Sequence, residues 1–176
     1  MSVETSDDQI IRVYDVIQHP FNTLAAYEKS RSGDESYESQ NPDLFQPDRL
    51  LFLDGVMKTR RLGEAASHES LVHPAMISHP EPKSVAIVGA GEGATLREVL
   101  KHKSVEKVVV LEFDETIVQV AREHLNSWND CSNIVGSRPC CYDYPREKIH
   151  IEDGPTWFSG RNDEEDKFDV VIVDSL

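Results

Sequence analysis

Acidic side chains follow each of four apolar segments of the sequence, directly after the segment ends. They are Glu92 after residues 85–88, Glu112 and Asp114 after residues 107–111, Asp153 after residues 148–151, and Asp174 after residues 168–173. Parallel strands of an open α/β sheet bring their carboxyl ends to one edge, where ligands bind. We therefore expect an acidic crevice that suits a cationic ligand and can accept a proton from it.

The glycine-rich turn around Glu92 is the most unusual of these positions. Gly89, Gly91 and Gly93 allow a tight turn and a close approach of the backbone to a ligand, and the turn fits the loose dinucleotide-binding pattern. A carboxylate at position 92 would face the pyrophosphate of NAD or FAD at the helix N-terminus that normally attracts such anions. A NAD-dependent enzyme is therefore the weakest interpretation, and a ligand that is neutral or cationic at this point is favoured.

Alternating strands and helices must position these residues. The four apolar segments are rich in β-branched residues, as is typical of parallel strands that are covered on both faces. Helices are predicted over residues 64–79, from Thr95 onward, and from about Glu115 to Leu125. The inward-facing residues expected on them are Leu71, Val72, Ala75, Met76, Leu96, Val99, Leu100, Ile117, Val120, Ala121 and Leu125. The predicted fold class is α/β, with a Rossmann-like doubly wound parallel sheet of the methyltransferase kind.

The N-terminal part has a different pattern. Residues 9–16 and 50–56 form two short strands, and the second ends at an Asp54-Gly55 turn. Between them, about residues 18–48 read as a long polar, mobile insertion. We expect an N-terminal β-hairpin region over residues 1–63 and a Rossmann-like domain over residues 64–176, the latter interrupted by a second polar insertion at 126–147.

Composition limits the classes of partner. The 176 residues include 18 basic and 32 acidic ones, which give a net charge of −14. This charge disfavours nucleic acid and anionic membranes as partners, although acidity can also serve solubility alone. No apolar run approaches the ~20 residues that span a bilayer. Cys131, Cys140 and Cys141 predict neither a disulfide framework nor a metal site, and so favour a reducing compartment, the cytoplasm.

Several stretches together resemble one known family. They are Leu53–Val56, His68-Glu69, Leu71–Met76, Gly89–His102, Ser104–Lys107, Glu112–Glu115, Ile151–Gly154 and Val170–Ser175. These stretches resemble the polyamine aminopropyltransferases, the spermidine synthase and thermospermine synthase family. The resemblance covers roughly residues 9–16 and 50–175 apart from the insertion at 126–147, and the run from Leu96 to His102 makes it specific.

The resemblance implies an activity and a set of ligands. A transferase of this family moves an aminopropyl group from decarboxylated S-adenosylmethionine to an amine such as putrescine or spermidine, and releases methylthioadenosine. The donor is a co-substrate, and no cofactor or metal is expected. Glu92, where aspartate is commoner, resembles the thermospermine synthase branch and so a tetraamine product. The N-terminal β element is compatible with a homodimer like those of the family.

The resemblance also implies roles for single residues. Asp174 would accept the proton from the attacking amine, and His68 and Glu92 would line the amine site with it. The residues implied on the donor side are Gln9, Gly89, Gly91, Glu112, Asp114, Asp153 and Gly154.

Two other interpretations stay open. The same fold supports small-molecule methyltransferases that use S-adenosylmethionine, and a non-catalytic relative would keep the fold without turnover. The family pattern also continues beyond Asp174 with a further aspartate, a gate loop and more strands and helices. From the sequence, the chain therefore resembles a C-terminally truncated fragment, which we expect to have little or no activity.

Overall fold

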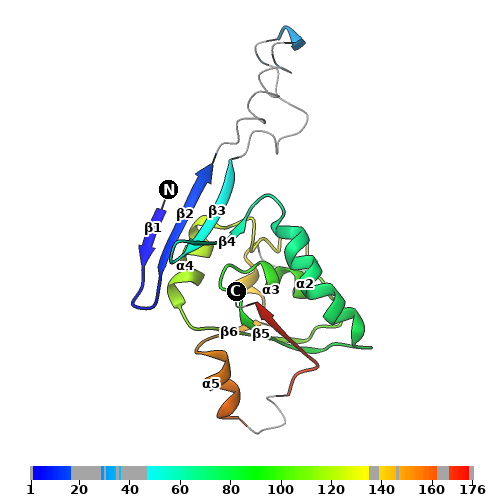
Figure 1. Ribbon diagram of the computed structural model, residues 1–176. Helices are drawn as coiled ribbons and strands as arrows, with labels where there is room; N and C mark the ends of the chain where they lie inside the picture. The colour runs from blue at the N-terminus through cyan, green and yellow to red at the C-terminus, as the bar shows by residue number, and fades with distance from the viewer. Residues whose placement is uncertain are drawn as a thin grey trace.

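Two four-stranded sheets make up the framework of the chain (Figure 1). The computed structural model describes residues 2–16, 29, 31–34, 36, 47–134, 139–145, 147–161 and 167–174. The N-terminal strands form an antiparallel sheet, and the remaining strands form a parallel sheet with helices around it. The predicted α/β class, with a parallel sheet and a small N-terminal β element, is confirmed.

The N-terminal sheet has the strand order β1-β2-β3-β4, which is more than the predicted hairpin. Its strands are β1 (Ser2–Thr5), β2 (Ile10–Val16), β3 (Asp48–Leu53) and β4 (Val56–Arg60). Strands β1 and β4 were not predicted, because both are largely exposed and lack an apolar pattern. Backbone pairing with their neighbours holds them in the sheet.

The predicted Asp-Gly turn joins β3 to β4. Asp54 and Gly55 have φ angles of 51° and 81°, the left-handed pair that a two-residue hairpin turn requires. Most of the predicted insertion at about 18–48 lies outside the described residues. Strand β3 begins at Asp48, the last residue of that approximate range, which is 2% exposed and accepts a hydrogen bond from the Leu62 amide at 3.0 Å.

The parallel sheet has the strand order β7-β6-β5-β8. Its strands are β5 (Ser84–Gly89), β6 (Lys107–Glu112), β7 (Glu147–Ile151) and β8 (Val170–Asp174). From β5 the chain adds strands on one side and then returns to place β8 on the other. In doubly wound folds the ligand crevice lies where the strand order reverses, which here is beyond the carboxyl ends of β5 and β8.

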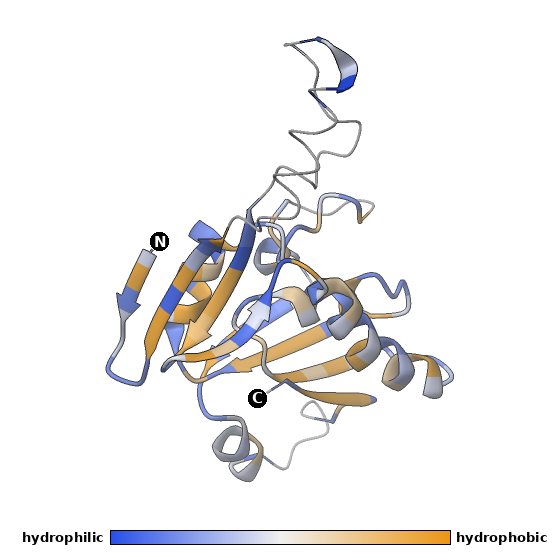
Figure 2. Cartoon of the chain, turned by 45° about the horizontal axis from the view of Figure 1, so that its top comes forward, coloured by the Kyte–Doolittle hydropathy of each residue, from blue (hydrophilic) through white to orange (hydrophobic). Residues whose placement is uncertain are grey.

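Helices cover both faces of this sheet. They are α2 (Glu64–Ser78), α3 (Ala94–Leu100), α4 (Glu115–His124) and α5 (Gly154–Ser159), with a 3₁₀ turn η2 (Cys141–Asp143). Figure 1 shows α5 on the side of the sheet opposite α2 and α3, and Figure 2 shows that the parallel strands are mostly hydrophobic. Alternate residues of β6 face opposite sides of the sheet. Val108 and Val110 belong to the main core, whereas Val109 and Leu111 pack with Trp157 of α5.

The predicted helix faces are mostly right. Val72 and Met76 of α2 are buried, but Leu71 is 36% exposed. All seven residues of α3 are buried, including Arg97 and Glu98, because this helix contacts α2, β5 and η2. A helix buried on all sides has to pair its own charges.

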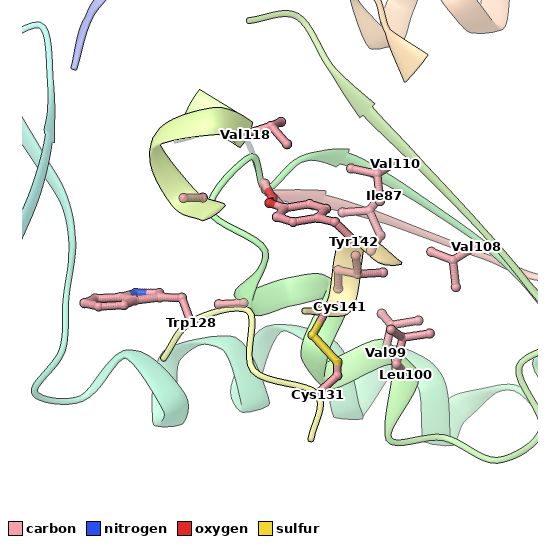
Figure 3. Packing of buried hydrophobic residues seen from close by; sticks show 14 of the residues in the cluster. Ile87, Val99, Leu100, Val108, Val110, Val118, Trp128, Cys131, Cys141 and Tyr142 are labelled. Carbon is pink, nitrogen blue, oxygen red and sulfur yellow. A yellow bond between two sulfur atoms is a disulfide. The ribbon is translucent and has the colours of Figure 1, made fainter. Parts of the chain in front are cut away.

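The prediction of a polar insertion at 126–147 is wrong. Trp128, Cys131, Cys141, Tyr142 and Tyr144 are all buried and belong to the main core (Figure 3). Their apolar contacts lie far apart along the chain and have no regular spacing, so periodicity could not reveal them.

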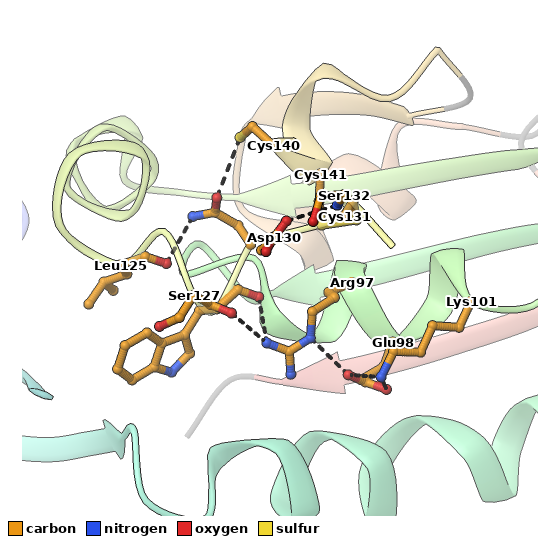
Figure 4. Close-up of a disulfide and its surroundings, with 12 residues drawn as sticks. Arg97, Glu98, Lys101, Leu125, Ser127, Asp130, Cys131, Ser132, Cys140 and Cys141 are labelled. Carbon is orange, nitrogen blue, oxygen red and sulfur yellow. Dashed lines mark hydrogen bonds and ion pairs between the residues drawn. A yellow bond between two sulfur atoms is a disulfide. The ribbon is translucent and has the colours of Figure 1, made fainter. Parts of the chain in front are cut away.

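A disulfide joins Cys131 to Cys141, with the two Cα atoms 5.1 Å apart (Figure 4). The prediction that the cysteines form no disulfide is wrong, and the inference of a reducing compartment loses its basis. The physical reason is local pairing: Cys131 N–H donates to the Pro139 carbonyl, and Cys141 N–H donates to that of Asn129, both at 2.8 Å. This pairing places the two sulfurs side by side, while Cys140 keeps a free thiol.

None of the helices that the structure describes is long and apolar enough to cross a membrane.

We predict that Cys131→Ser destabilises the protein by about 2–3 kcal/mol, because the disulfide restricts a short loop in the unfolded chain. The measurement is urea denaturation without reductant. Cys140→Ser is the control: the half-buried Cys140 donates to Asn129 Oδ1 at 3.5 Å, and a serine hydroxyl can replace it while the disulfide remains. Equal midpoints for native protein and Cys131→Ser would contradict the prediction.

Candidate active site

Three side chains from separate elements meet beyond the carboxyl ends of β5 and β8. His68 of α2, Glu92 of the glycine turn and Asp174 of β8 each offer an atom within 4.8 Å of the others. His68 is 6% exposed, and the two acids are partly buried. The cluster occupies the point of the sheet where the strand order reverses, which is where a ligand is expected.

The glycine turn is built from strained backbone that its neighbours hold in place. Gly89, Ala90 and Gly93 have φ angles of 83°, 70° and 89°. A Cβ on Gly93 would lie 2.7 Å from Asn129 Cβ and 3.0 Å from the Tyr142 hydroxyl oxygen. That hydroxyl donates to the Gly91 carbonyl. Residues on both sides of the disulfide-bonded loop therefore pack against the turn.

Asp174 is held by contacts from β5 and α3. The parallel register of β5 and β8 pairs it with Gly89, and the Thr95 hydroxyl donates to its carboxylate. Burial, together with the charge of Glu92, raises the pKa of Asp174 to about 6, although the Thr95 hydrogen bond and His68 oppose this. Such a carboxylate is ionised at pH 7 and can still accept a proton.

His68 is a cation that the protein itself places in the cluster. Its Nδ1 lies 2.6 Å from the carbonyl oxygen of Glu64 and 3.3 Å from Glu64 Oε2, and its Nε2 lies 3.1 Å from Glu92 Oε1. Burial lowers the pKa of His68, but the hydrogen bonds to Glu64 and Glu92 outweigh it and raise the pKa to about 10. Both ring nitrogens therefore donate, and the positive charge offsets one of the neighbouring carboxylates.

Glu112 lies beside the glycine turn at the end of β6 and is 5% exposed. Burial raises its pKa and the charge of Glu92 adds to the effect, whereas backbone N–H groups of Asp114, Phe113 and Gly91 oppose it. A Cβ on Gly91 would lie 2.8 Å from Glu112 Oε2, so the carboxylate depends on that glycine for its space.

The N-terminal sheet reaches the same edge through Ser6 and Gln9. Ser6 Oγ donates to Asp114 Oδ2 at 2.6 Å, and the Gln9 side chain also hydrogen-bonds to Asp114. Burial raises the pKa of Asp114, but hydrogen bonds, including these two, outweigh burial and lower the pKa. Gln9 is 8% exposed and Asp114 2%. The structure thus places Gln9 next to the end of β6.

Asp114 and Asp153 have a structural use that the sequence analysis did not consider. Each is the N-cap of a helix: Asp114 accepts from Thr116 N at 2.8 Å, and Asp153 accepts from Thr156 N at 3.1 Å. Asp153 is exposed, and the structure does not place its carboxylate in the cluster. Gly154, in contrast, is buried, and a Cβ there would lie 2.6 Å from Val88 Cγ1.

Sequence reasoning missed two side chains that contact the cluster, Glu64 and Thr95. Glu64 is four residues before His68 on the same helix, a spacing that brings side chains together, and this signal was available. Thr95 was identified only as the start of a helix. Its contact with Asp174 crosses 79 residues and could not be read from the sequence.

Two groups of side chains within the described residues have the spacing of metal ligands: the cluster itself and Glu69, His73 and Glu98. In the first, both ring nitrogens of His68 donate hydrogen bonds and leave no lone pair for a metal. In the second, Lys101 Nζ already lies 2.6 Å from Glu98 Oε2. A cationic side chain of the protein therefore already contacts the acids of each group.

Comparisons with known proteins agree on one family. Residues 64–176 match the family model described as the spermine/spermidine synthase domain. The chain is 48% identical over 126 residues to a polyamine aminopropyltransferase of Aeropyrum pernix, covering 72% of this chain and 37% of that protein. It is 37% identical over 150 residues to one of Thermococcus onnurineus, covering 84% of this chain and 49% of that protein.

Solved structures lead to the same fold. A spermidine synthase in complex with the transition state analogue AdoDATO has a TM-score of 0.71 and 32% identity, covering all of this chain and 46% of that one. The spermidine synthase of Thermotoga maritima has the same score and identity, covering all of this chain and 47% of that one. The chain thus spans half or less of the length of these relatives, and over that length it has the methyltransferase-like fold that was predicted.

We predict that Gly91→Ala destabilises the protein by about 1–3 kcal/mol, the usual effect of overpacking. The new methyl group would lie 2.3 Å from Ile117 Cγ2 as well as against Glu112. Gly160→Ala is the matched control, because its Cβ would come no closer than 4.0 Å to any other atom and its φ of −85° suits alanine. The check is chemical denaturation, and an equal effect of the two substitutions would refute the prediction.

Proposed function

This chain belongs to the spermine/spermidine synthase family, and on that premise we propose that the whole protein transfers an aminopropyl group from decarboxylated S-adenosylmethionine to a polyamine. The acceptor is putrescine or spermidine, and the second product is methylthioadenosine. The observation that most supports the proposal is the position of Asp174, a partly buried acid with a raised pKa next to Glu92 at the point where the strand order of the sheet reverses. The donor is a co-substrate, and we propose no bound cofactor or metal.

We propose that the donor nucleoside lies along the glycine turn. Glu112 is buried beside Gly91, and a carboxylate at the end of the second parallel strand suits the hydroxyl pair of a ribose. Gln9, Asp114, Gly89, Asp153 and Gly154 remain the other proposed donor-side residues. Asp153 would act there as a helix cap whose remaining oxygen faces solvent, which makes it the weakest member of the set.

The amine side needs a proton acceptor. A primary amine has a pKa near ~10, so it is mostly protonated at neutral pH and has no lone pair for attack. In the proposed reaction the amine proton moves to Asp174, and the nitrogen lone pair forms a bond to the aminopropyl carbon. The carbon–sulfur bond breaks, and its electrons stay on sulfur, which changes from a sulfonium to a neutral thioether. Asp174 and Glu92 supply negative charge for the cationic reactants.

The partners, the oligomeric state and the cellular location of the protein are also proposals. The net charge of −14 suits a small cationic substrate better than nucleic acid or an anionic membrane. The homodimer rests on the N-terminal sheet and its family resemblance. We keep the cytoplasm as the proposed location; the disulfide, which is more typical of oxidising compartments, argues against it, and cell fractionation decides the question.

The direct test is an assay of the protein at its full natural length with decarboxylated S-adenosylmethionine and putrescine or spermidine. Release of methylthioadenosine with formation of the longer amine is the expected result. A parallel reaction with S-adenosylmethionine distinguishes the methyltransferase interpretation, because a methylated product would replace the aminopropyl product. A protein that binds the donor but shows neither reaction would be the non-catalytic relative.

We predict that Asp174→Asn lowers the turnover rate by about 10²–10⁴-fold, the usual contribution of a positioned proton acceptor. The fold and the affinity for methylthioadenosine should change little, because the amide can still accept the Thr95 hydrogen bond. Glu106→Gln serves as the control, since Glu106 is 68% exposed and pairs with Lys83 far from the cluster along the sheet. An unchanged rate in Asp174→Asn would remove the residue from the mechanism.

The pH dependence follows from the same residue. Asp174 acts as a base only when it is ionised, and it takes its proton from the ammonium form of the amine, so we expect kcat/KM for the amine to rise with pH through about 6 and to fall again toward ~10, where the amine has already lost that proton. The measurement is a pH–rate profile from pH 5 to 9. The lower step should be missing in whatever activity Asp174→Asn retains, and its persistence there would assign it to another group.

A further inference from the structure

Glu64 lies at the first position of α2 and connects His68 to Arg97 of α3. Arg97 binds its carboxylate with two nitrogens, at 3.1 Å to Oε1 and 2.9 Å to Oε2. The same Oε2 lies 3.3 Å from His68 Nδ1. The side chains of Glu64 and Arg97 are each only 10% exposed, so the fork of hydrogen bonds is largely shielded from water.

Arg97 is itself held rigidly. Its Nη1 donates to the carbonyls of Ser127 and Trp128 at 3.0 and 2.9 Å, and its Nε donates to Glu98 Oε1 at 2.9 Å (Figure 4). All three guanidinium nitrogens are therefore engaged. A guanidinium fixed on these sides can present only one orientation to Glu64, and Glu64 in turn can present only one to His68.

The contacts do not end at the ion pair. They continue from Arg97 to Glu64, from Glu64 to His68, and from His68 Nε2 to Glu92 Oε1 at 3.1 Å. An ion pair that served only to join α2 to α3 would not need a carboxylate oxygen on the histidine. This series of contacts runs from the core toward the crevice, which suggests that Glu64 has a role in the site.

We propose that Glu64 is a positioning residue of the amine site. It holds His68 with both ring N–H groups donating: Nδ1–H faces the carbonyl oxygen of Glu64 at 2.6 Å and its carboxylate Oε2 at 3.3 Å, and Nε2–H donates to Glu92. His68 then stays a cation over the working pH range, fixes the Glu92 carboxylate and offsets charge beside Asp174. The consequence for the amine rests on the proposed function, whereas the charge state of His68 does not.

The charges around His68 explain why this matters. The groups that face it are Glu64 from its own helix, Glu92 from the turn and Asp174 from β8, with Arg97 acting through Glu64. With a positive His68, the cluster of His68, Glu92 and Asp174 has a net charge of −1 when both acids are ionised. A neutral His68 would leave −2 and would hold the ammonium form of the amine more tightly, which opposes the loss of its proton and so disfavours attack by the free amine.

The experiment compares Glu64→Gln, which keeps the shape and removes the charge, with Glu64→Asp, which keeps the charge on a shorter side chain. Glu69→Gln is the matched control on the same helix, because the Glu69 side chain is 50% exposed and its nearest cation, Lys101, is 3.9 Å away. The His68 ring is titrated by NMR in the isotope-labelled protein. We expect Glu64→Gln to lower the pKa of His68 by about 1 to 2, Glu64→Asp to lower it less, and Glu69→Gln to leave it unchanged.

Kinetics provides a second measurement. If Glu64 had only a structural role, its substitution would not change the amine kinetics while leaving the donor affinity the same. In Glu64→Gln, kcat/KM for the amine should fall by about 10-fold, the effect of one lost charged hydrogen bond, and it should decline further toward pH ~9 as His68 loses its proton. The affinity for methylthioadenosine should stay within about 2-fold of native, because the donor side has its own contacts. Glu64→Asp should restore most of the amine kinetics.

Two outcomes would overturn the inference. One is a His68 pKa in Glu64→Gln equal to the native one; the other is a lowered pKa without any change in the amine kinetics or pH profile. If Glu64→Gln does not fold, Glu64→Asp provides the same test through its smaller shift, and no shift there overturns the inference. If the native protein transfers no aminopropyl group, the proposed function fails, while the titration still decides whether Glu64 sets the charge of His68.

Discussion

The parallel pairing of β5 with β8 determines where everything else in the site can be. Its register places Gly89 next to Asp174, so the catalytic carboxylate we propose lies directly beside the start of the glycine turn. The turn then has to leave the strand with left-handed backbone angles, which only close packing beneath it can maintain. The Tyr142 hydroxyl on the Gly91 carbonyl, and the space that Gly93 leaves for Tyr142, provide that packing.

Buried charge is the second constraint, and the structure meets it by pairing. The helix α3 is buried over its whole length yet contains Arg97 and Glu98, which can remain charged there only because each has opposite charges in contact. Arg97 extends this pairing to Glu64, and Glu64 extends it to His68. The charges that stabilise the helix packing and those that shape the crevice thus form one continuous network.

This network also explains why the segment at 126–147 belongs to the core. The carbonyl oxygens of Ser127 and Trp128 complete the hydrogen bonds of Arg97, and Tyr142 supports the turn that positions Glu92. The disulfide between Cys131 and Cys141 fixes the two parts of the segment relative to each other. A stretch with a polar sequence therefore stabilises the two features on which the site depends.

The sequence by itself determined the four parallel strands, the strands β2 and β3, the helices α2, α3 and α4, and the acids at the ends of β5, β6 and β8, because hydrophobic periodicity and glycine turns are local signals. It could not determine that Asp153 caps α5, that Cys131 pairs with Cys141, or that Thr95 contacts Asp174. Each of these depends on which groups the folded chain brings together, and an acid after a strand reads the same whether it caps a helix or faces a ligand. The charge of His68 is the clearest case. The sequence shows that residue 68 is a histidine, but its protonation state depends on two carboxylates that only the tertiary structure places beside it.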